Sequence, residues 1–173
     1  MVESSRGVKY IGEDDKIVWP PVVIIENTIT GYDPVKKTQI CLENSEVRQF
    51  LKNMKELEFD KVVALYGRNG PRGKTLVAFP TSPAGYTDAK TLCQCLDEHQ
   101  RGRVHWEKIR HGPRDGHGMA TPDGKRILYG YLATYRDMDQ LDYNHKVIKK
   151  WSVESYYEKI VLPLRHIEHV MYP

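Results

Sequence analysis

The chain has 173 residues, of which 40% are hydrophobic and 28% charged, and its net charge is +3. This length allows one domain with its own core, and no run approaches the ~18 apolar residues that cross a bilayer. The amino terminus has no apolar signal region, which argues against export. The three cysteines are an odd number, which argues against a disulfide framework and predicts a reducing compartment, cytoplasm or nucleus.

The charge is unevenly placed along the chain. Lys61 to Lys74 holds four basic residues and no acidic ones, and Arg101 to Arg126 holds seven basic residues against three acidic ones. Such segregation is typical of an anion-binding face. The alternative interpretation is two solvated loops.

The sequence predicts a polar leader at 1–16, followed by one domain over residues 17–150. The first half of this domain contains one predicted strand, a turn and a helix. Val22–Ile25 is a short apolar run that predicts a buried strand, and a turn is expected from Gly31 to Pro34. Next, Asn44-Ser45 is suited to cap a helix, because apolar residues then recur at helical spacing as far as Leu57.

The second half contains a predicted hairpin with strands at about 61–66 and 74–80, joined by a turn rich in glycine, proline and arginine. A helix is expected from Thr87 to His99, a long basic loop over 100–126, and a last strand over 127–133. The order β-α-β-β-α-β predicts an α+β fold of the RRM-like, ferredoxin-like split βαβ type. In it, two helices cover one face of a four-stranded antiparallel sheet and leave the other face open.

The segment 151–173 is expected to be helical. Its apolar residues are spaced 4-3-4-3-4, as in a coiled coil: Val153, Tyr157, Ile160, Leu164, Ile167 and Met171. Pro163 interrupts the pattern at a cost to a helix of ~3 kcal/mol or more. The segment is either a helix packed on the domain or the start of a homodimer seam.

Two motifs compete for the predicted hairpin. Gly67 with Gly73-Lys74-Thr75 nearly forms a phosphate-binding loop, but an apolar strand follows where that loop must open a helix. Arg72 to Phe79 also half-fits the RNA-recognition strand pattern. Alternation places Lys74 and Leu76 on the open sheet face, where stacking aromatics normally sit. If this sheet binds RNA, phosphates and duplex shape should therefore matter more than unstacked bases.

The region 101–126 suggests three further roles. Four histidines recur every six residues from His99 to His117, which is wider than zinc-ligand spacing, so we expect no metal site and no cofactor. Asp115 and His117 are the only candidates for a hydrolase, and no second carboxylate accompanies them. Trp106, between Arg103 and Lys108, is suited either to stack on a terminal nucleotide or to anchor the loop.

The sequence resembles the XS domain of the plant suppressor-of-gene-silencing proteins and their relatives. The resemblance spans about residues 16 to 160, and its segments are Ile17–Ile25, Tyr66–Phe79 with Arg72-Gly73, Gly85-Tyr86 with Ala89, Trp106, Leu128–Ala133 and Asp137–Asn144. Such domains are similar to an RRM fold without its usual aromatic strands. The resemblance implies binding of double-stranded RNA, especially with a 5′ overhang, and transfer to an RNA-dependent RNA polymerase pathway for small interfering RNA production. It also implies cytoplasmic granules, with the nucleus as the alternative.

The leading hypothesis is thus a non-catalytic RNA-binding domain. Its expected RNA-contacting residues are Arg68, Arg72, Lys74, Arg101, Arg103, Trp106, Lys108 and Arg110. The alternative is a protein-interaction or dimerisation scaffold that uses the open sheet face around Leu76 and the carboxy-terminal apolar stripe.

Overall fold

The computed structural model describes residues 15–113 and 117–165. In chain order its elements are β1 (Lys16–Trp19), β2 (Val22–Glu26), β3 (Ile29–Asp33), β4 (Thr38–Cys41), α2 (Asn44–Met54), β5 (Lys61–Gly67), β6 (Gly70–Ala78), α3 (Pro83–Glu98), α4 (Arg103–Arg110), β7 (Tyr129–Leu132), α5 (Tyr135–Leu141), β8 (Ser152–Ser155) and the π-helical segment η1 (Tyr157–Val161). The predicted α+β class is confirmed. Among the described residues, no helix is long and apolar enough to span a membrane.

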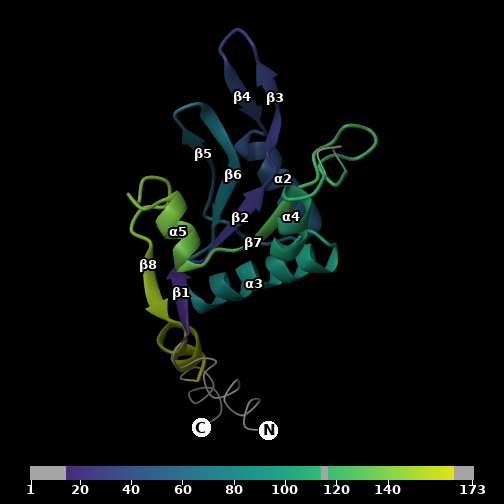
Figure 1. Cartoon of the computed structure of the whole chain (residues 1–173). Helices are drawn as coiled ribbons and strands as arrows, with labels where there is room; N and C mark the ends of the chain where they lie inside the picture. Colours follow the sequence, from purple (N-terminus) through teal and green to yellow (C-terminus); the bar gives the residue numbers. More distant parts are fainter. Residues whose placement is uncertain (1–14, 114–116, 166–173) are drawn as a thin grey trace.

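The largest sheet is antiparallel and has the strand order β5-β6-β2-β7 (Figure 1). Its centre is β2, whose five residues are all buried. Ile24 pairs with Leu76 of β6 on one side and with Tyr131 of β7 on the other. A strand covered on both faces needs apolar residues at every position, and the run Val22–Ile25 supplies them.

One face of this sheet carries α2 and α3. Val23 and Ile25 of β2 and Val77 of β6 pack with helix residues such as Leu51 and Leu92 in one core. Alternation along β6 had assigned Val77 and Phe79 to this face, and that prediction is confirmed.

The two helices begin earlier than predicted. In α2 the N-cap is Glu43, whose backbone N–H donates to Glu46 Oε1 at 2.9 Å, while Asn44 Oδ1 accepts the Ala64 backbone N–H at 3.0 Å. In α3 the cap is Ser82 and not Thr87; its hydroxyl accepts the Gly85 backbone N–H at 3.0 Å. A proline follows at position 83, where the first helical turn tolerates it.

The other face of the sheet is not open, and the prediction that it is uncovered was wrong. Ile24, Leu76 and Ala78 pack beneath α5 and the segment that follows it, through Met138, Ile148 and Trp151. Leu76 is fully buried. The physical reason is that Ile24 and Leu76 on this face are aliphatic. Two exposed aliphatic side chains at the sheet centre would each forgo about 1.5–3 kcal/mol of burial, so the chain returns to cover them.

The predicted long loop over 100–126 contains a helix, α4. Gly102 starts it, with its backbone N–H donating to His105 Nδ1 at 3.1 Å. The side chain of Trp106 anchors α4 against the sheet at β7. A helix of eight residues is too short for a clear periodic pattern.

A hairpin formed by β3 and β4 replaces the turn predicted at Gly31 to Pro34. Gly31 lies within β3, and the turn falls later, where Asp33 Oδ1 accepts the backbone N–H groups of Val35 and Lys36 at 2.9 and 3.2 Å. The hairpin lies against β6 and extends beyond the main sheet (Figure 1).

The carboxy-terminal stretch also differs from the prediction. Ser152–Ser155 is a strand that pairs antiparallel with β1, with Val153 opposite Val18. The predicted helical heptads therefore do not begin at Val153. Helical backbone follows from η1 to residue 165, while the later heptad positions Ile167 and Met171 lie outside the described residues.

Candidate functional site

The tip of the β5–β6 hairpin carries two of the predicted RNA-contacting residues. Arg68 and Arg72 are both exposed, and neither makes an ion pair within the described part of the chain. Tyr66, beside them on β5, is 65% exposed. Two cations and an aromatic ring are therefore exposed to solvent at the tip of one hairpin.

The β3–β4 hairpin lies directly beside this tip. Gly73 has φ +82°, and its carbonyl accepts the Thr28 backbone N–H at 3.2 Å. A Cβ on Gly70 would stand 3.3 Å from Thr38 Cβ, so glycine permits the close approach of β6 to β4. Cys41 Sγ lies 4.0 Å from Tyr66 Oη.

The second hairpin adds charge that the sequence had not singled out. Lys36 and Lys37 are exposed in its turn and make no ion pair among residues 15–113 and 117–165. Tyr32 is 55% exposed on β3. We call the set Tyr32, Lys36, Lys37, Tyr66, Arg68 and Arg72 the hairpin surface. The sequence signal was a lysine pair between two short strand-like segments, which the predicted turn at Gly31 to Pro34 obscured.

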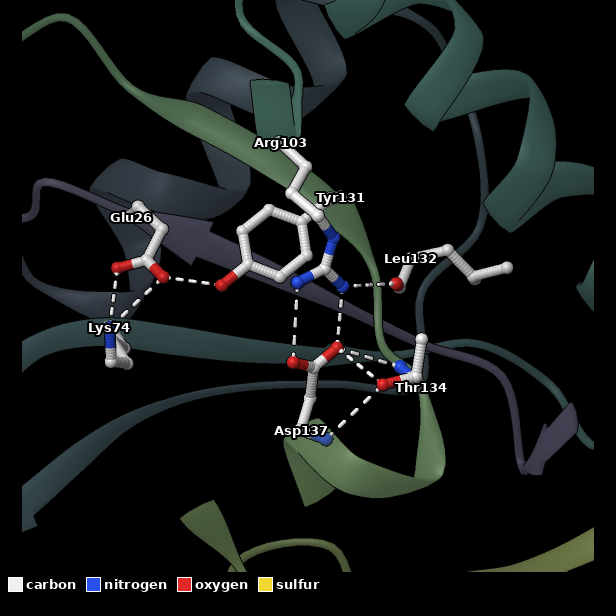
Figure 2. A network of polar contacts seen from close by, with 7 residues as sticks. All are labelled: Glu26, Lys74, Arg103, Tyr131, Leu132, Thr134 and Asp137. Carbon is white, nitrogen blue, oxygen red and sulfur yellow. Dashed lines mark hydrogen bonds and ion pairs between the residues drawn. The ribbon is translucent and has the colours of Figure 1, made fainter. Parts of the chain in front are cut away.

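Lys74, also predicted to contact RNA, points elsewhere. Its Nζ forms an ion pair with Glu26 Oε1 at 2.8 Å, and the Glu26 side chain is only 3% exposed. The Tyr131 hydroxyl donates to the other oxygen of Glu26 at 2.5 Å (Figure 2). Burial and the Glu26 charge raise the pKa of Tyr131. Lys74 thus neutralises a buried carboxylate.

Arg103 belongs to the same polar network. Its guanidinium lies 3.8 Å above the Tyr131 ring and forms a bidentate pair with Asp137 at 2.5 and 3.3 Å (Figure 2). It also donates to the Leu132 carbonyl at 3.3 Å. Burial lowers its pKa, but the hydrogen bond to Asp137 and the charges of Asp137, Tyr131 and Glu107 together outweigh this effect, and the net shift is upward. Arg103 therefore ties α4 to β7 and to the start of α5.

Trp106 lies in the core, as the anchoring interpretation expected. Its side chain is 8% exposed and its ring centroid is 5.3 Å from that of Tyr129. The remaining predicted residues lie nearby. Lys108 and Arg110 are exposed on α4, where Arg110 pairs with Glu107 at 3.4 Å. Arg101 lies 5.7 Å above the Phe50 ring.

The predicted residues therefore fall into two groups. The hairpin surface lies at the β5–β6 tip and the adjacent β3–β4 hairpin, whereas α4 packs on β7. Strands β5 and β7 form opposite edges of the main sheet. Three strand spacings of about 4.8 Å separate the edge strands. Asp115 lies outside the described residues, so the proposed pairing with His117 has no structural description. Among the described residues, no group of three metal-ligating side chains gathers.

A hollow of about 420 Å³ opens between β1, α3 and the β7–α5 turn. Tyr86, Lys90 and Tyr156 line it, and burial together with the neighbouring Tyr156 raises the pKa of Tyr86 to about 12. A smaller hollow of about 240 Å³ adjoins it across Lys90 and Leu132. In it, burial raises the pKa of Cys93 to about 12, so this thiol stays protonated at neutral pH.

Most of the chain matches one known protein family. Residues 14–140 match the family model of the XS domain. The chain belongs to the XS domain family. The resemblance stated from the sequence is thereby confirmed. The matched range includes the whole four-stranded sheet with α2 and α3, and it ends within α5.

Three relatives illustrate the match. The XS domain is 35% identical over 169 residues to the Arabidopsis thaliana protein SUPPRESSOR OF GENE SILENCING 3, covering 92% of this chain and 24% of that protein. It is 34% identical to the Solanum lycopersicum protein of the same name, covering 90% and 23%. It is 31% identical to the Oryza sativa subsp. indica homolog, covering 90% and 24%. The chain thus spans about a quarter of the length of these relatives.

Proposed function

We propose that this XS domain is a non-catalytic module that binds double-stranded RNA in gene silencing. The observation that carries the proposal is a contrast between two surfaces. The sheet face on which an RRM stacks bases is filled by the domain's own core around Ile24 and Leu76. Exposed, unpaired cations instead extend from two adjacent hairpins. Such a surface is suited to the regular phosphates of a duplex.

We further propose that the domain is RRM-like. The support is the connection order of the main sheet, β2-α2-β5-β6-α3-β7, with β2 and β6 at its centre. The β3–β4 hairpin and α4 are insertions into this order. The departure from an RRM is the cover formed by α5 and the following segment.

The silencing role rests on the names of the relatives. We propose that the domain holds RNA duplexes, especially those with a 5′ overhang, for an RNA-dependent RNA polymerase pathway that makes small interfering RNA. The corresponding compartment is the cytoplasm, in granules. Because the chain spans about a quarter of these relatives, the whole-protein partners are part of the proposal.

Fluorescence anisotropy tests the binding proposal. The labelled ligands are RNA duplexes with blunt, 5′-overhang and 3′-overhang ends, a DNA duplex of the same sequence, and single-stranded RNA. We expect the 5′-overhang RNA duplex to bind most tightly and the affinity to fall steeply with salt, because neutralised phosphates release counterions. Equal, negligible binding of all ligands at low salt would contradict the proposal.

A second candidate is a dimerisation scaffold built on the carboxy-terminal stretch. The sheet face around Leu76 no longer supports it, since Leu76 is buried. Val153, Leu162 and Leu164 are 41–45% exposed and do support it. Light scattering of the full chain and of the chain truncated after Trp151 tests this candidate. A monomeric full chain would exclude it.

A further inference from the structure

The segment from Asp142 to Trp151, which we call the capping loop, connects α5 to β8 and covers the sheet face opposite α2 and α3. One carboxylate organises it. Asp142 accepts the backbone N–H groups of Lys146 and Val147 at 3.0 Å each and that of Ile148 at 2.9 Å. Asp142 is 3% exposed. A buried carboxylate that accepts three amides fixes the backbone conformation around it.

Further contacts hold both ends of the capping loop. The Trp151 indole N–H donates to the Asp142 carbonyl at 3.0 Å, and the His145 ring stacks on the indole at 4.6 Å. Lys61 Nζ, at the start of β5, donates to the Val147 carbonyl at 2.6 Å. His145 and Lys150 have φ of 54° and 59°, a backbone region that residues other than glycine adopt only where surrounding contacts enforce it.

The loop separates its residues by polarity. Val147, Ile148 and Trp151 face the core, whereas residues 143–146, 149 and 150 are exposed. The lysines of this exposed set are Lys146, Lys149 and Lys150, and none of them makes an ion pair in the described parts of the chain. Within the loop the only acidic residue is Asp142, whose carboxylate already accepts its three amides. The capping loop therefore presents three unneutralised cations on a fixed backbone.

The position of the loop links it to the hairpin surface. Edge strand β5 contacts the capping loop through Lys61 at its start and leads to Arg68 in the turn after its end. Six residue steps at about 3.3 Å give a separation of about 20 Å between the ends of β5. A nucleic-acid duplex presents on the order of ten phosphate charges over such a length. The capping loop thus contacts one end of edge strand β5, and the hairpin surface lies at its other end.

We propose that the capping loop is a second phosphate-contacting surface for the duplex that the hairpin surface binds, with Lys146, Lys149 and Lys150 as its contacts. The inference rests on the proposed RNA-binding function and adds a site to it. The capping loop would then act in two ways, because it covers the sheet face on which an RRM binds RNA and also contacts RNA itself. The capping loop covers the sheet face that would stack bases, and its lysines contact phosphates of the RNA backbone instead. Because the loop is already ordered, less conformational entropy is lost on binding.

Anisotropy titrations over a range of salt concentrations test this site. The variants of the full chain are K146Q/K149Q/K150Q, the hairpin variant R68Q/R72Q, and the matched control K52Q/K55Q/K125Q. The control lysines are also exposed, but Lys52 lies on α2, Lys55 directly after it, and Lys125 shortly before β7. For the loop variant we expect at least about 5-fold weaker binding of a 5′-overhang RNA duplex and a salt slope reduced by about 2–3. The control should bind within 2-fold of the wild-type chain by the same principle.

The outcomes separate this inference from the proposed function. If the wild-type chain binds no duplex, both fall. If it binds and only the hairpin variant weakens, the inference falls and the proposed function stands. If the wild-type chain bound polyglutamate as tightly as the RNA duplex, the lysines would form a general anion-binding surface, and the inference would also be overturned. A melting curve checks folding of the triple variant, and K149Q/K150Q, which leaves the Asp142-bound residue Lys146 unchanged, must show the same direction of effect.

Discussion

The guanidinium of Arg103 lies 3.8 Å above the ring of Tyr131 while both of its terminal nitrogens donate to Asp137. The ring in turn donates through its hydroxyl to buried Glu26, which Lys74 neutralises. Two cations that the sequence assigned to RNA contact are therefore engaged with protein carboxylates. This chain of contacts joins α4, β7, β2, β6 and α5 (Figure 2).

The Arg103–Asp137 pair should make stability depend on acidic pH. Burial favours the neutral acid, but hydrogen bonds from Arg103 and Thr134 outweigh it and hold the pKa of Asp137 below its ordinary value of 3.8. Between the lowered pKa of Asp137 in the folded chain and its ordinary value of 3.8 in the unfolded chain, only the unfolded chain binds the proton. The stabilisation by the ion pair is therefore complete above pH 3.8 and is lost as the pH falls through the folded-state pKa. In denaturant titrations from pH 6 to pH 2, we expect the wild-type chain to lose about 1–2 kcal/mol more than D137N.

The control for this experiment is T134A, which removes the capping hydroxyl at α5 but keeps the ion pair with Arg103. It should lower stability by about 1 kcal/mol at neutral pH, since a cap is lost. It should keep most of the acid dependence, because the Arg103 pair remains and only the hydroxyl contact of Thr134 with Asp137 is removed. A wild-type pH profile parallel to that of D137N would show that the pair contributes nothing.

Replacing Leu76 tests whether the second sheet face is covered in solution. Leu76 is fully buried beneath Met138 and Trp151, so L76A should lower the free energy of unfolding by about 2–5 kcal/mol. The control L164A removes a side chain that is 45% exposed and should cost less than about 1 kcal/mol. Equal, small effects in chemical denaturation would mean that the face is open.

Trp106 separates an anchoring role from a nucleotide-stacking role. Because its ring packs on Tyr129 and is 8% exposed, W106A should destabilise the domain by about 3–5 kcal/mol. W106F keeps an aromatic ring in the same place and should bind duplex RNA within 2-fold of the wild-type chain. If Trp106 stacked on a terminal base, W106F would retain part of the stacking and W106A, measured below its melting temperature, would lose about 1–3 kcal/mol of binding.

The hairpin surface should act mainly through charge. Removing two exposed, unpaired cations in R68Q/R72Q is expected to weaken duplex RNA binding about 10-fold and to lower the salt slope by about 2, with little change in melting temperature. The comparison is K52Q/K55Q on and beside α2, which removes the same charge from another element. Loss of affinity in both variants to the same degree would indicate general electrostatics and no specific surface.

Part of this description could be predicted from the sequence. Alternation along Lys74 to Phe79 assigned Val77 and Phe79 to the helix-covered face, since side chains in a strand point to opposite sides in turn. The strands at Val22–Ile25 and 127–133 were found because short apolar runs indicate buried strands. The resemblance to the XS domain followed from the order and spacing of several segments, and the family match confirms it.

Other parts depend on contacts between residues far apart in the chain. The pairing of Lys74 with Glu26 joins positions 48 residues apart, and that of Arg103 with Asp137 joins positions 34 apart. A local sequence pattern does not identify partners this far apart. A cation that pairs with a carboxylate therefore cannot be distinguished in the sequence from one that stays unpaired. The seven residues of α5 are too few to show a helical period, and the capping loop has none, because the carboxylate of Asp142 shapes it.

The sequence by itself thus determined the fold class, the strands of the main sheet, the faces taken along Lys74 to Phe79, the segregation of charge and the family. These properties follow from local periodicity, residue type and spacing. Only the tertiary structure decided that the second sheet face is covered, that the β3–β4 hairpin lies beside the β5–β6 tip, and which cations remain unpaired. Burial of Ile24 and Leu76 and desolvation of Glu26 and Asp137 drive those choices, and both are properties of the packed chain.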